Sequence, residues 1–381
     1  SYLSKECDFK VEDEKDMELI GYLAFLDPPK QSAASAIKQL HEHGIEVKIL
    51  SGDNDAVVQT IARQVGIETR NALTGPQFEA MEEEEQRQAV CKTNVFSKLT
   101  PIQKTQIIML LQEQQNTVGF LGDGINDAAA LRQSDIGISV DSAVDIAKES
   151  ADIILLEKDL MVLEDGVLEG RKTFGNITKY IKMTASSNFG NMFSVMAASA
   201  FLPFLPMLPI HLLIQNLLYD ISQTTIPFDR MDADYLRKPR KWDASDISRF
   251  MIFIGPISSI FDIVTYLVMW YVFSCNSVEH QTLFQSGWFI EGLLSQTLIV
   301  HMIRTQKIPF IQSCASWQVT GLTVLIMVIG IIIPFSPFGT SIGLEPLPLS
   351  YFPWLVGILL SYCVLTQMIK NWYIKRFVKW L

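Results

Sequence analysis

The sequence predicts a Rossmann-like α/β domain followed by an all-α bundle of six membrane-spanning helices. Over the first 157 residues, apolar runs alternate with helical patterns, which is typical of parallel βαβ units. After Lys158 the chain becomes a series of long apolar segments, and a helix needs about 20 such residues to cross a bilayer. The charge divides at the same place. Residues 1–157 carry 27 acids and 14 bases, whereas residues 158–381 carry 14 acids and 17 bases.

The acidic balance of the first part excludes a nucleic-acid partner, because nucleic-acid binding needs a basic surface. The five cysteines are far apart and odd in number, so neither a disulfide framework nor a zinc cluster is expected. The chain begins at Ser1 in a polar segment without a signal peptide. We therefore expect it to be part of a longer protein.

The α/β part is expected to contain six strands and five helices. The predicted strands are Leu19–Leu26, Ile45–Leu50, Val95–Leu99, Thr117–Leu121, Ile136–Val140 and Ile153–Leu156. The predicted helices are Ser32–His43, Asn54–Val65, Pro76–Val90, Pro101–Gln115 and Asn126–Ser134. Gly44 and Gly66 stand where helices are expected to stop. In a parallel sheet of this kind, ligands bind at the carboxyl ends of the strands.

The turn Gly122–Asp127 is the most informative motif in the chain. It places two carboxylates, Asp123 and Asp127, and the amide of Asn126 between a predicted strand and a predicted helix. Two acids so close repel each other unless a cation lies between them. The turn could be an ordinary Asx-type turn, but its position at a strand end favours Mg²⁺ next to a phosphoryl group.

Two more strand ends carry groups that suit a phosphate. Ser51, Gly52 and Asp53 follow one strand and offer a hydroxyl and backbone N–H groups at a helix start. Lys104 lies in the first turn of the next such helix, where it can reach a phosphate as a point charge. Alone, these could be an N-capped turn and a surface lysine. Their occurrence at successive strand ends, together with the Gly122–Asp127 turn, predicts one catalytic site.

The second part is expected to cross the membrane six times. The predicted spans are Ile177–Leu202, Pro209–Phe228, Arg249–Ser274, Leu283–Ile303, Trp317–Pro334 and Phe352–Tyr373. Lys and Arg gather in alternate connections, at residues 230–241, 304–307 and 370–379, and the connections between them contain none. Because positive loops stay in the cytoplasm, both ends of the chain and the acidic domain are placed there.

Some polar residues lie inside the predicted spans. Asn188 and Asn191 are three apart, and Asn216 and Asp220 are four apart, so each pair shares a helix face. Polar groups inside a span usually mark an ion or substrate path. The alternative is hydrogen bonding between helices. The sequence leaves the role of Asp262 open between pairing inside the bundle and lining the ion path.

In the motifs of its α/β part, the sequence resembles the haloacid dehalogenase superfamily and, within it, the P-type ATPases. Gly122–Asp127 looks like that family's hinge motif, and Ser51-Gly52-Asp53 resembles its Thr-Gly-Asp motif with Ser in place of Thr. Asp27-Pro28-Pro29 matches its hinge between nucleotide-binding and phosphorylation domains, and Lys104 falls at its phosphate-binding lysine.

The membrane part sharpens the resemblance. Ser187–Asn191 and Gln215–Asp220 look most like the bacterial magnesium-transporting P-type ATPases. The resemblance implies three regions. Residues 1–26 would end a nucleotide-binding domain and its hinge, residues 27–157 would form the C-terminal part of a phosphorylation domain, and residues 158–381 would form family spans five to ten.

The family's Asp-Lys-Thr-Gly-Thr motif is absent from the sequence. The resemblance therefore implies that the aspartate phosphorylated by ATP lies outside this chain, and we expect the chain alone to be inactive. Asp123 and Asp127 would bind the catalytic Mg²⁺. Ser51 and Lys104 would neutralise phosphoryl charge, which is the main contribution of a protein to such a transfer.

The resemblance also implies a site for the transported ion at Asn188, Asn191, Asn216 and Asp220, with Gln296 as a weaker member. Related calcium pumps carry acids at the positions of Asn191 and Gln296. A single carboxylate among neutral oxygens suits Mg²⁺, which sheds its water reluctantly. Glu291 is a candidate for an entry site.

The expected function is therefore ATP-driven Mg²⁺ transport across the bacterial inner membrane, into the cytosol. The expected partners are Mg²⁺, ATP, the lipid bilayer and the N-terminal remainder of the pump. The alternatives are a pump for Ca²⁺ or H⁺, or a membrane-tethered phosphatase of the same superfamily.

Overall fold

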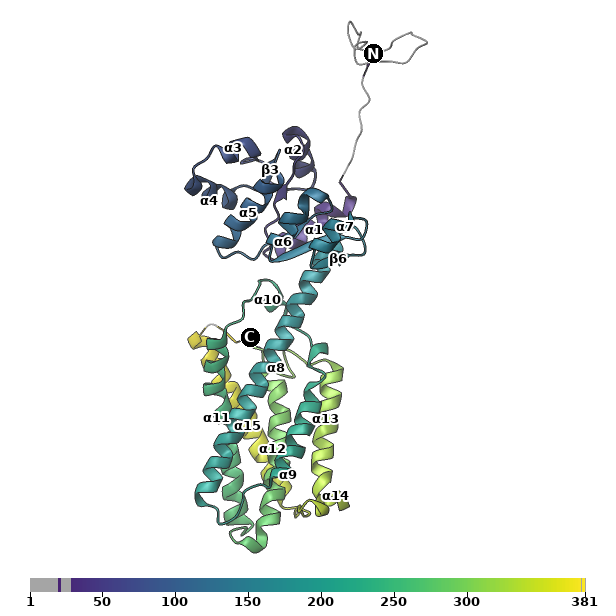
Figure 1. The fold of residues 1–381 in the computed structure, drawn as a ribbon. Coiled ribbons are helices and arrows are strands. Elements are labelled where there is room, and N and C mark those ends of the chain that lie inside the picture. The colour runs from purple at the N-terminus through teal and green to yellow at the C-terminus, as the bar shows by residue number, and fades with distance from the viewer. Residues whose placement is uncertain (1–19, 22–28, 378, 381) are drawn as a thin grey trace. The chain divides into compact units, whose positions relative to one another are not determined.

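The computed structural model describes residues 20–21, 29–377 and 379–380. The chain divides into two compact units, Ser1–Glu164 and Asp165–Leu381. Figure 1 shows strands and short helices in the first unit and long helices in the second. The predicted strand Leu19–Leu26 and the predicted hinge Asp27-Pro28-Pro29 lie almost wholly outside the described residues.

In the first unit, the described residues form two parallel sheets of three strands each. One has the order β1-β3-β2 and the other β4-β5-β6. The strands are β1 (Ile49–Leu50), β2 (Leu73–Thr74), β3 (Val95–Ser97), β4 (Gly119–Leu121), β5 (Ile136–Val140) and β6 (Ile153–Leu155). Ile49 pairs with Val95 and Phe120 with Gly137. The parallel arrangement predicted from the alternation of strands and helices is confirmed for these strands.

The helices of this unit follow local sequence signals. They are α1 (Gln31–Glu42), α2 (Asp55–Gln64), α3 (Gly75–Glu79), α4 (Glu83–Lys92), α5 (Pro101–Glu113), η2 (Ile125–Asp127), α6 (Ala128–Gln133) and α7 (Asp145–Ser150). Gly44 and Gly66 follow α1 and α2 with φ of 72° and 81°. This is the left-handed conformation that glycine adopts at helix stops.

The prediction of a single helix over Pro76–Val90 is wrong. Thr74 and Gln77 form a capping box that starts α3, and Glu82 and Glu85 form another that starts α4. Each capping box satisfies backbone N–H groups at a helix start. Two starts within eight residues therefore divide the segment, although its apolar spacing alone would allow a continuous helix.

The two sheets share part of their core. Leu50 in β1 packs against the cluster around Phe120 and Ile138 as well as the cluster around Phe78 and Phe96. β1 and β4 are both edge strands of their sheets. The apolar core of the first unit is therefore continuous at Leu50, which packs against the clusters of both sheets.

The second unit has six long helices among the described residues. They are α8 (Leu160–Phe201), α9 (Pro209–Gln223), α11 (Ala244–Leu267), α12 (Gln281–Ile303), α13 (Trp317–Ile332) and α15 (Tyr351–Phe377). Helix α12 contacts α9, α11, α13 and α15, and nearly all its side chains are buried, so it is the central helix. Short elements connect the others: η3 (Ile226–Phe228), α10 (Ala233–Leu236), η4 (Val268–Val272), η5 (Val278–His280), η6 (Ile333–Phe335) and α14 (Pro337–Ser341).

Three helical stretches within the described residues are long and apolar enough to cross a membrane. They are Ala244–Val272, Trp317–Phe335 and Tyr351–Phe377. Helix α9, at 15 residues, is short for a span, and α12 carries buried polar side chains such as Gln285 and Glu291. Of the six spans predicted from the sequence, three are thus supported by their length and composition.

Candidate functional site

The turn after β4 is built around a close approach of the backbone to Asp127. A Cβ added at Gly122 would lie 2.6 Å from the Cβ of Asp127, so only glycine fits there. The Nζ of Lys104 lies 2.8 Å from Oδ1 of Asp127, and the two side chains are 11% and 14% exposed. The N–H of Gly124 donates to Oδ2 of the same carboxylate at 3.3 Å. The structure therefore brings Lys104 and Asp127 together, as their strand-end positions predict.

Asp123 lies more openly on the same turn. Its Oδ2 is 2.8 Å from the Nζ of Lys158, and both side chains are more than half exposed. Asp123 and Lys158 also line a cavity of about 320 Å³ together with Lys30 and Ser32. Lys158 was not among the site residues predicted from the sequence. Its one signal was its place just after β6, at the carboxyl end of a strand in the same sheet.

The carboxylates of Asp123 and Asp127 are of the ligand type that Mg²⁺ prefers. The described residues contain no group of three or more His, Cys, Asp or Glu side chains placed to bind a metal ion. A magnesium ion here would therefore take its other ligands from phosphate and water, as Mg²⁺ usually does. The donor set fits such an ion, with Asp123 the more accessible of the two acids.

The turn after β1 is held by its own side chains. The hydroxyl of Ser51 donates to Oδ2 of Asp53 at 2.9 Å, and the N–H of Asp53 donates to Oγ of Ser51 at 3.1 Å. Asn54 caps α2 by accepting from the N–H of Ala56. Gly52 approaches the carbonyl of Leu99, 3.3 Å from where a Cβ would lie.

Asp55, in the first turn of α2, also belongs to this surface. Its carboxylate accepts from the hydroxyl of Ser97 at 2.7 Å and from Gln59 at 2.8 Å. These hydrogen bonds, that from Ser97 first, lower the pKa of Asp55. No hydrogen bond or ion pair found among the described residues joins Ser51 or Asp53 to Asp123 or Asp127. Asn126 is exposed.

In the second unit, the structure joins two of the residues predicted to bind the transported ion. Nε2 of Gln296 on α12 donates to Oδ1 of Asn191 on α8 at 2.9 Å. Asn188, Asn216 and Asp220 are exposed on α8 and α9. The five predicted residues are therefore not gathered into one site by the part of the chain that the structure describes.

A second polar cluster lies inside the bundle. Asp262 on α11 is 3% exposed and accepts hydrogen bonds from the hydroxyl of Ser194 and from Nε1 of Trp288, the latter at 2.8 Å. Glu291 on α12 is fully buried next to Asp262. Asp262 is thus paired with polar groups inside the bundle. Ser194 was missed, although it lies three residues after Asn191 on the same helix face.

Two protein-family models match the chain. Residues 2–135 match the haloacid dehalogenase-like hydrolases. Residues 204–372 match the C-terminus of cation transporting ATPases. The first match covers the turns at Ser51 and Asp123, and the second covers α9 to α13 and most of α15.

Curated relatives match nearly the whole chain. It is 66% identical to a magnesium-transporting ATPase, P-type 1, of Salmonella typhimurium strain LT2, over 97% of this chain and 41% of the relative. It is 59% identical to the protein of the same name in Escherichia coli K12, over 98% of this chain and 42% of the relative. An endoplasmic reticulum calcium ATPase of Aspergillus fumigatus is 33% identical over 68% of this chain and 28% of its own length. The chain thus spans about two fifths of the length of its magnesium-transporting relatives.

Proposed function

Since the chain belongs to the P-type ATPases, we propose that it forms the C-terminal part of an ATP-driven pump that moves Mg²⁺ across a membrane. The observation that carries this proposal is the high identity, along nearly the whole chain, to relatives named as magnesium-transporting. The direction into the cytosol, the bacterial inner membrane and the cytoplasmic position of both ends are part of the same proposal. They rest on the resemblance and on the loop charges.

The two parallel sheets support a phosphorylation site that a further strand completes. Among the described residues, β1 and β4 each pair with one strand only, and the turns at Ser51 and Asp123 follow their carboxyl ends. A strand between these edges would place its own carboxyl end next to both turns, since ligand sites form there in parallel sheets. We propose that this strand carries the aspartate that ATP phosphorylates and belongs to the remainder of the pump.

The residues of this chain would then act on the phosphoryl group. Lys104 and the backbone N–H groups after Ser51 would neutralise its charge, and the Ser51 hydroxyl would donate a hydrogen bond to it. Asp123 would bind the catalytic Mg²⁺, which supplies charge neutralisation to the transferring phosphoryl group. Asp127 is largely committed to Lys104 and Gly124, so it would order the turn.

For the membrane half, we propose that all six long helices span the bilayer and that α8, α9 and α12 bind the cargo. A carboxylate facing lipid is costly, so the exposed Asp220 requires cover in a membrane. The remaining helices of the pump would cover Asp220, Asn216 and Asn188. The joined pair of Asn191 and Gln296 would line the same path.

The test is magnesium transport by the full-length pump in proteoliposomes, with Mg·ATP held constant and free Mg²⁺ varied. Asp220→Asn removes the one carboxylate of the predicted set, and we expect Mg²⁺ binding at least about tenfold weaker, equal to about 1.4 kcal/mol. Asp234→Asn is the control, because Asp234 is an exposed acid whose carboxylate lies 3.8 Å from Arg237 on the surface. Unchanged transport in Asp220→Asn would refute the assignment.

Calcium is the second candidate cargo, and the similarity to the fungal calcium ATPase is the observation that favours it. The same preparation distinguishes the two ions. We expect ATP-driven uptake of Mg²⁺ and none of Ca²⁺. Uptake of Ca²⁺ alone, or a pH gradient without either ion, would show that the cargo is wrong while the P-type mechanism stands.

A further inference from the structure

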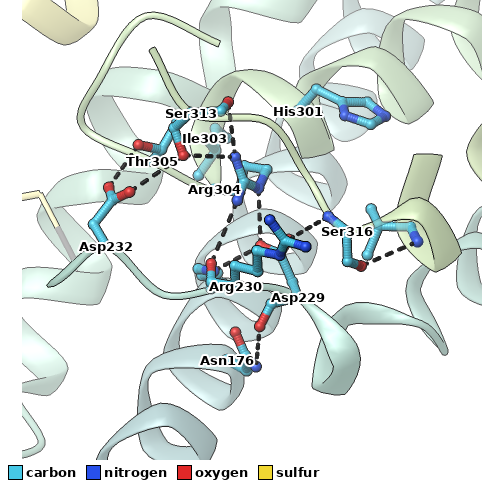
Figure 2. A network of polar contacts seen from close by, with 12 residues as sticks. Asn176, Asp229, Arg230, Asp232, His301, Ile303, Arg304, Thr305, Ser313 and Ser316 are labelled. Carbon is cyan, nitrogen blue, oxygen red and sulfur yellow. Dashed lines mark hydrogen bonds and ion pairs between the residues drawn. The ribbon is translucent and has the colours of Figure 1, made fainter. Parts of the chain in front are cut away.

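The segment that follows α9 is tied into the bundle by one buried carboxylate. Asp229 has a side chain only 3% exposed. Its Oδ2 accepts from Nζ of Lys179 on α8 at 2.7 Å and from Nε of Arg304, the residue after α12, at 2.8 Å. Its Oδ1 accepts from the N–H of Ser316, the cap of α13, at 3.2 Å. The Asp229 side chain therefore contacts α8, the residue that follows α12 and the residue that caps α13. Figure 2 shows its surroundings at Arg304 and Ser316.

The backbone around Asp229 is fixed as well. Nδ2 of Asn176 on α8 donates to the carbonyls of Pro227 and Asp229, both at 3.1 Å. Nζ of Lys179 reaches the carbonyl of Arg230 at 2.9 Å. The chain at the end of η3 is thus held by side chains from α8, which donate hydrogen bonds to the carbonyls of Pro227, Asp229 and Arg230.

A second acid extends the network toward the connection between α12 and α13. Asp232 accepts from the hydroxyls of Thr305 at 2.6 Å and Ser313 at 3.2 Å. Arg304 donates through Nη1 to both the carbonyl and the hydroxyl of Ser313, at 3.1 Å each. Figure 2 shows dashed contacts from Arg304 to Ser313 and to Asp229, and from Asp232 to Thr305 and Ser313, so that Ser313 links Arg304 to the second acid. We call Asp229, Lys179, Arg304 and Asp232 the clamp.

Two of the helices tied together by the clamp, α8 and α12, carry residues proposed to bind the cargo, and the segment that contains Asp229 follows α9, which carries another. α8 carries Asn191, α9 carries Asp220 and α12 carries Gln296. Along a helix, Lys179 is about 18 Å from Asn191, and Arg304 is about 12 Å from Gln296, at 1.5 Å per residue. A helix is stiff over such lengths, so fixing one end sets the height of each side chain relative to its neighbours.

We propose that Asp229 is a positioning residue that holds α8, α9 and α12 at the mutual heights that cation binding requires. The inference rests on the proposed function. Asp229 touches no cargo itself, because its oxygens are taken by Lys179, Arg304 and Ser316. Its effect passes through the register of the helices. A small loss of register is costly at a binding site, since a misplacement of about 1 Å can cost about 100-fold in function.

A role in stability alone would give a different result. Asp229→Asn keeps the shape and an acceptor for the N–H of Ser316, but it removes the negative charge that the buried side chains of Lys179 and Arg304 both contact. A stability role predicts less folded pump, with unchanged dependence on Mg²⁺ per folded molecule. A positioning role predicts a changed Mg²⁺ dependence in the molecules that do fold.

The test compares Asp229→Asn with the wild-type full-length pump in proteoliposomes, using monodisperse protein and fixed Mg·ATP. We expect the free Mg²⁺ concentration for half-maximal transport to rise about tenfold, while the maximal rate changes by less than about threefold. Asp234→Asn, an exposed acid in the same connection, is expected to leave both values unchanged. Asp229→Glu restores the charge and is expected to recover part of the shift.

If Asp229→Asn yields no folded pump, the same transport measurement is made on Arg304→Lys. This variant keeps the charge but loses the Nη contacts with Ser313 and Arg230. A half-maximal concentration equal to that of wild type in the folded variant overturns the inference, and so does an equal shift in Asp234→Asn. A wild-type pump that transports no Mg²⁺ is a separate outcome, which refutes the proposed function and the inference with it.

Discussion

At the scale of single residues, the turn at Asp123 depends on a glycine, Gly122, which has no side chain. The backbone of Gly122 lies so near Asp127 that an added Cβ would be 2.6 Å from its Cβ and 3.0 Å from its carboxyl group. Real atoms do not approach so closely, so either the turn or Asp127 would have to move. Asp127 is also the partner of Lys104, so the geometry of both charged groups depends on this one glycine.

Gly122→Ala should therefore lower ATP-driven phosphorylation of the full-length pump by about 100-fold, since a displacement of about 1 Å at a catalytic site has an effect of that order. Transfer of labelled phosphate from ATP measures it. Gly119→Ala is the matched control in β4, because its added Cβ would meet its nearest neighbour, the carbonyl of Ile136, at 3.9 Å, an ordinary contact. Equal phosphorylation in the two variants would contradict this account.

The sequence could predict residues whose place follows from strand order, and it failed where tertiary packing decides. Lys104 and Asp127 meet because both follow strands of parallel units. Lys158 was missed, although it too follows a predicted strand, because the sequence does not show that this strand, β6, lies in the same sheet as β4. Periodicity placed Asn216 and Asp220 on one face of α9, but it could not tell which neighbour covers that face.

At the scale of elements, local signals fix the ends of helices and strands. β5 has the predicted bounds, Ile136–Val140, because aspartates flank its apolar run on both sides. The segment over Pro76–Val90 was predicted as one helix, because apolar spacing does not reveal the capping boxes that start at Thr74 and Glu82. β2 was missed because two residues are too few to show a period of two.

The cap of α11 gives a pH dependence that can be measured. Asp243 accepts from the hydroxyl and N–H of Ser245, from Nζ of Lys379 and from the N–H of Asp246. These contacts, the hydroxyl of Ser245 first, lower the pKa of Asp243 to about 2. A lowered pKa stabilises the folded state above the unfolded value of about 3.9. We expect that stabilisation to disappear as the pH falls from about 4 to about 2.

Asp243→Asn isolates the effect, because Asn is an equally good N-cap but does not titrate in this range. The measurement is the unfolding temperature of the wild type minus that of the variant, between pH 6 and pH 2. The difference should be constant and positive above about pH 5 and should shrink toward zero at the acid end. A difference that stays constant down to pH 2 would show that the carboxylate charge contributes nothing at the cap.

At the scale of the whole molecule, two regimes of hydropathy correctly predicted two kinds of fold. The alternating first part forms parallel sheets with helices, and the apolar second part forms long helices. The prediction of membrane spans was least secure for α8, α9 and α12. The polar side chains of α12 are hidden among its neighbours, so its composition understates how completely it is buried. The spacing of residues in the sequence could not show that the polar side chains of α12 are buried.

The helices of the second unit are also joined by a residue far along the chain. Trp380 is 2% exposed, and its Nε1 donates to the carbonyl of Ile303 at the end of α12, at 2.8 Å. Its own carbonyl accepts from Nζ of Lys182 on α8 at 2.6 Å. Its ring packs edge-on against Phe250 of α11, with ring centroids 4.9 Å apart. Through its side chain and its carbonyl, this one residue connects three helices whose sequence positions are distant.

Trp380→Ala should destabilise the second unit by about 3–5 kcal/mol, the usual cost of replacing a buried aromatic side chain with alanine. The loss combines the apolar contacts with Phe250, the hydrogen bond to Ile303 and the anchoring of the carbonyl that Lys182 contacts. Thermal unfolding of the purified protein measures it. Trp317→Ala is the matched control, because Trp317 is 79% exposed and its removal should change the unfolding temperature little. Equal shifts in the two variants would mean that Trp380 does not hold the helices together.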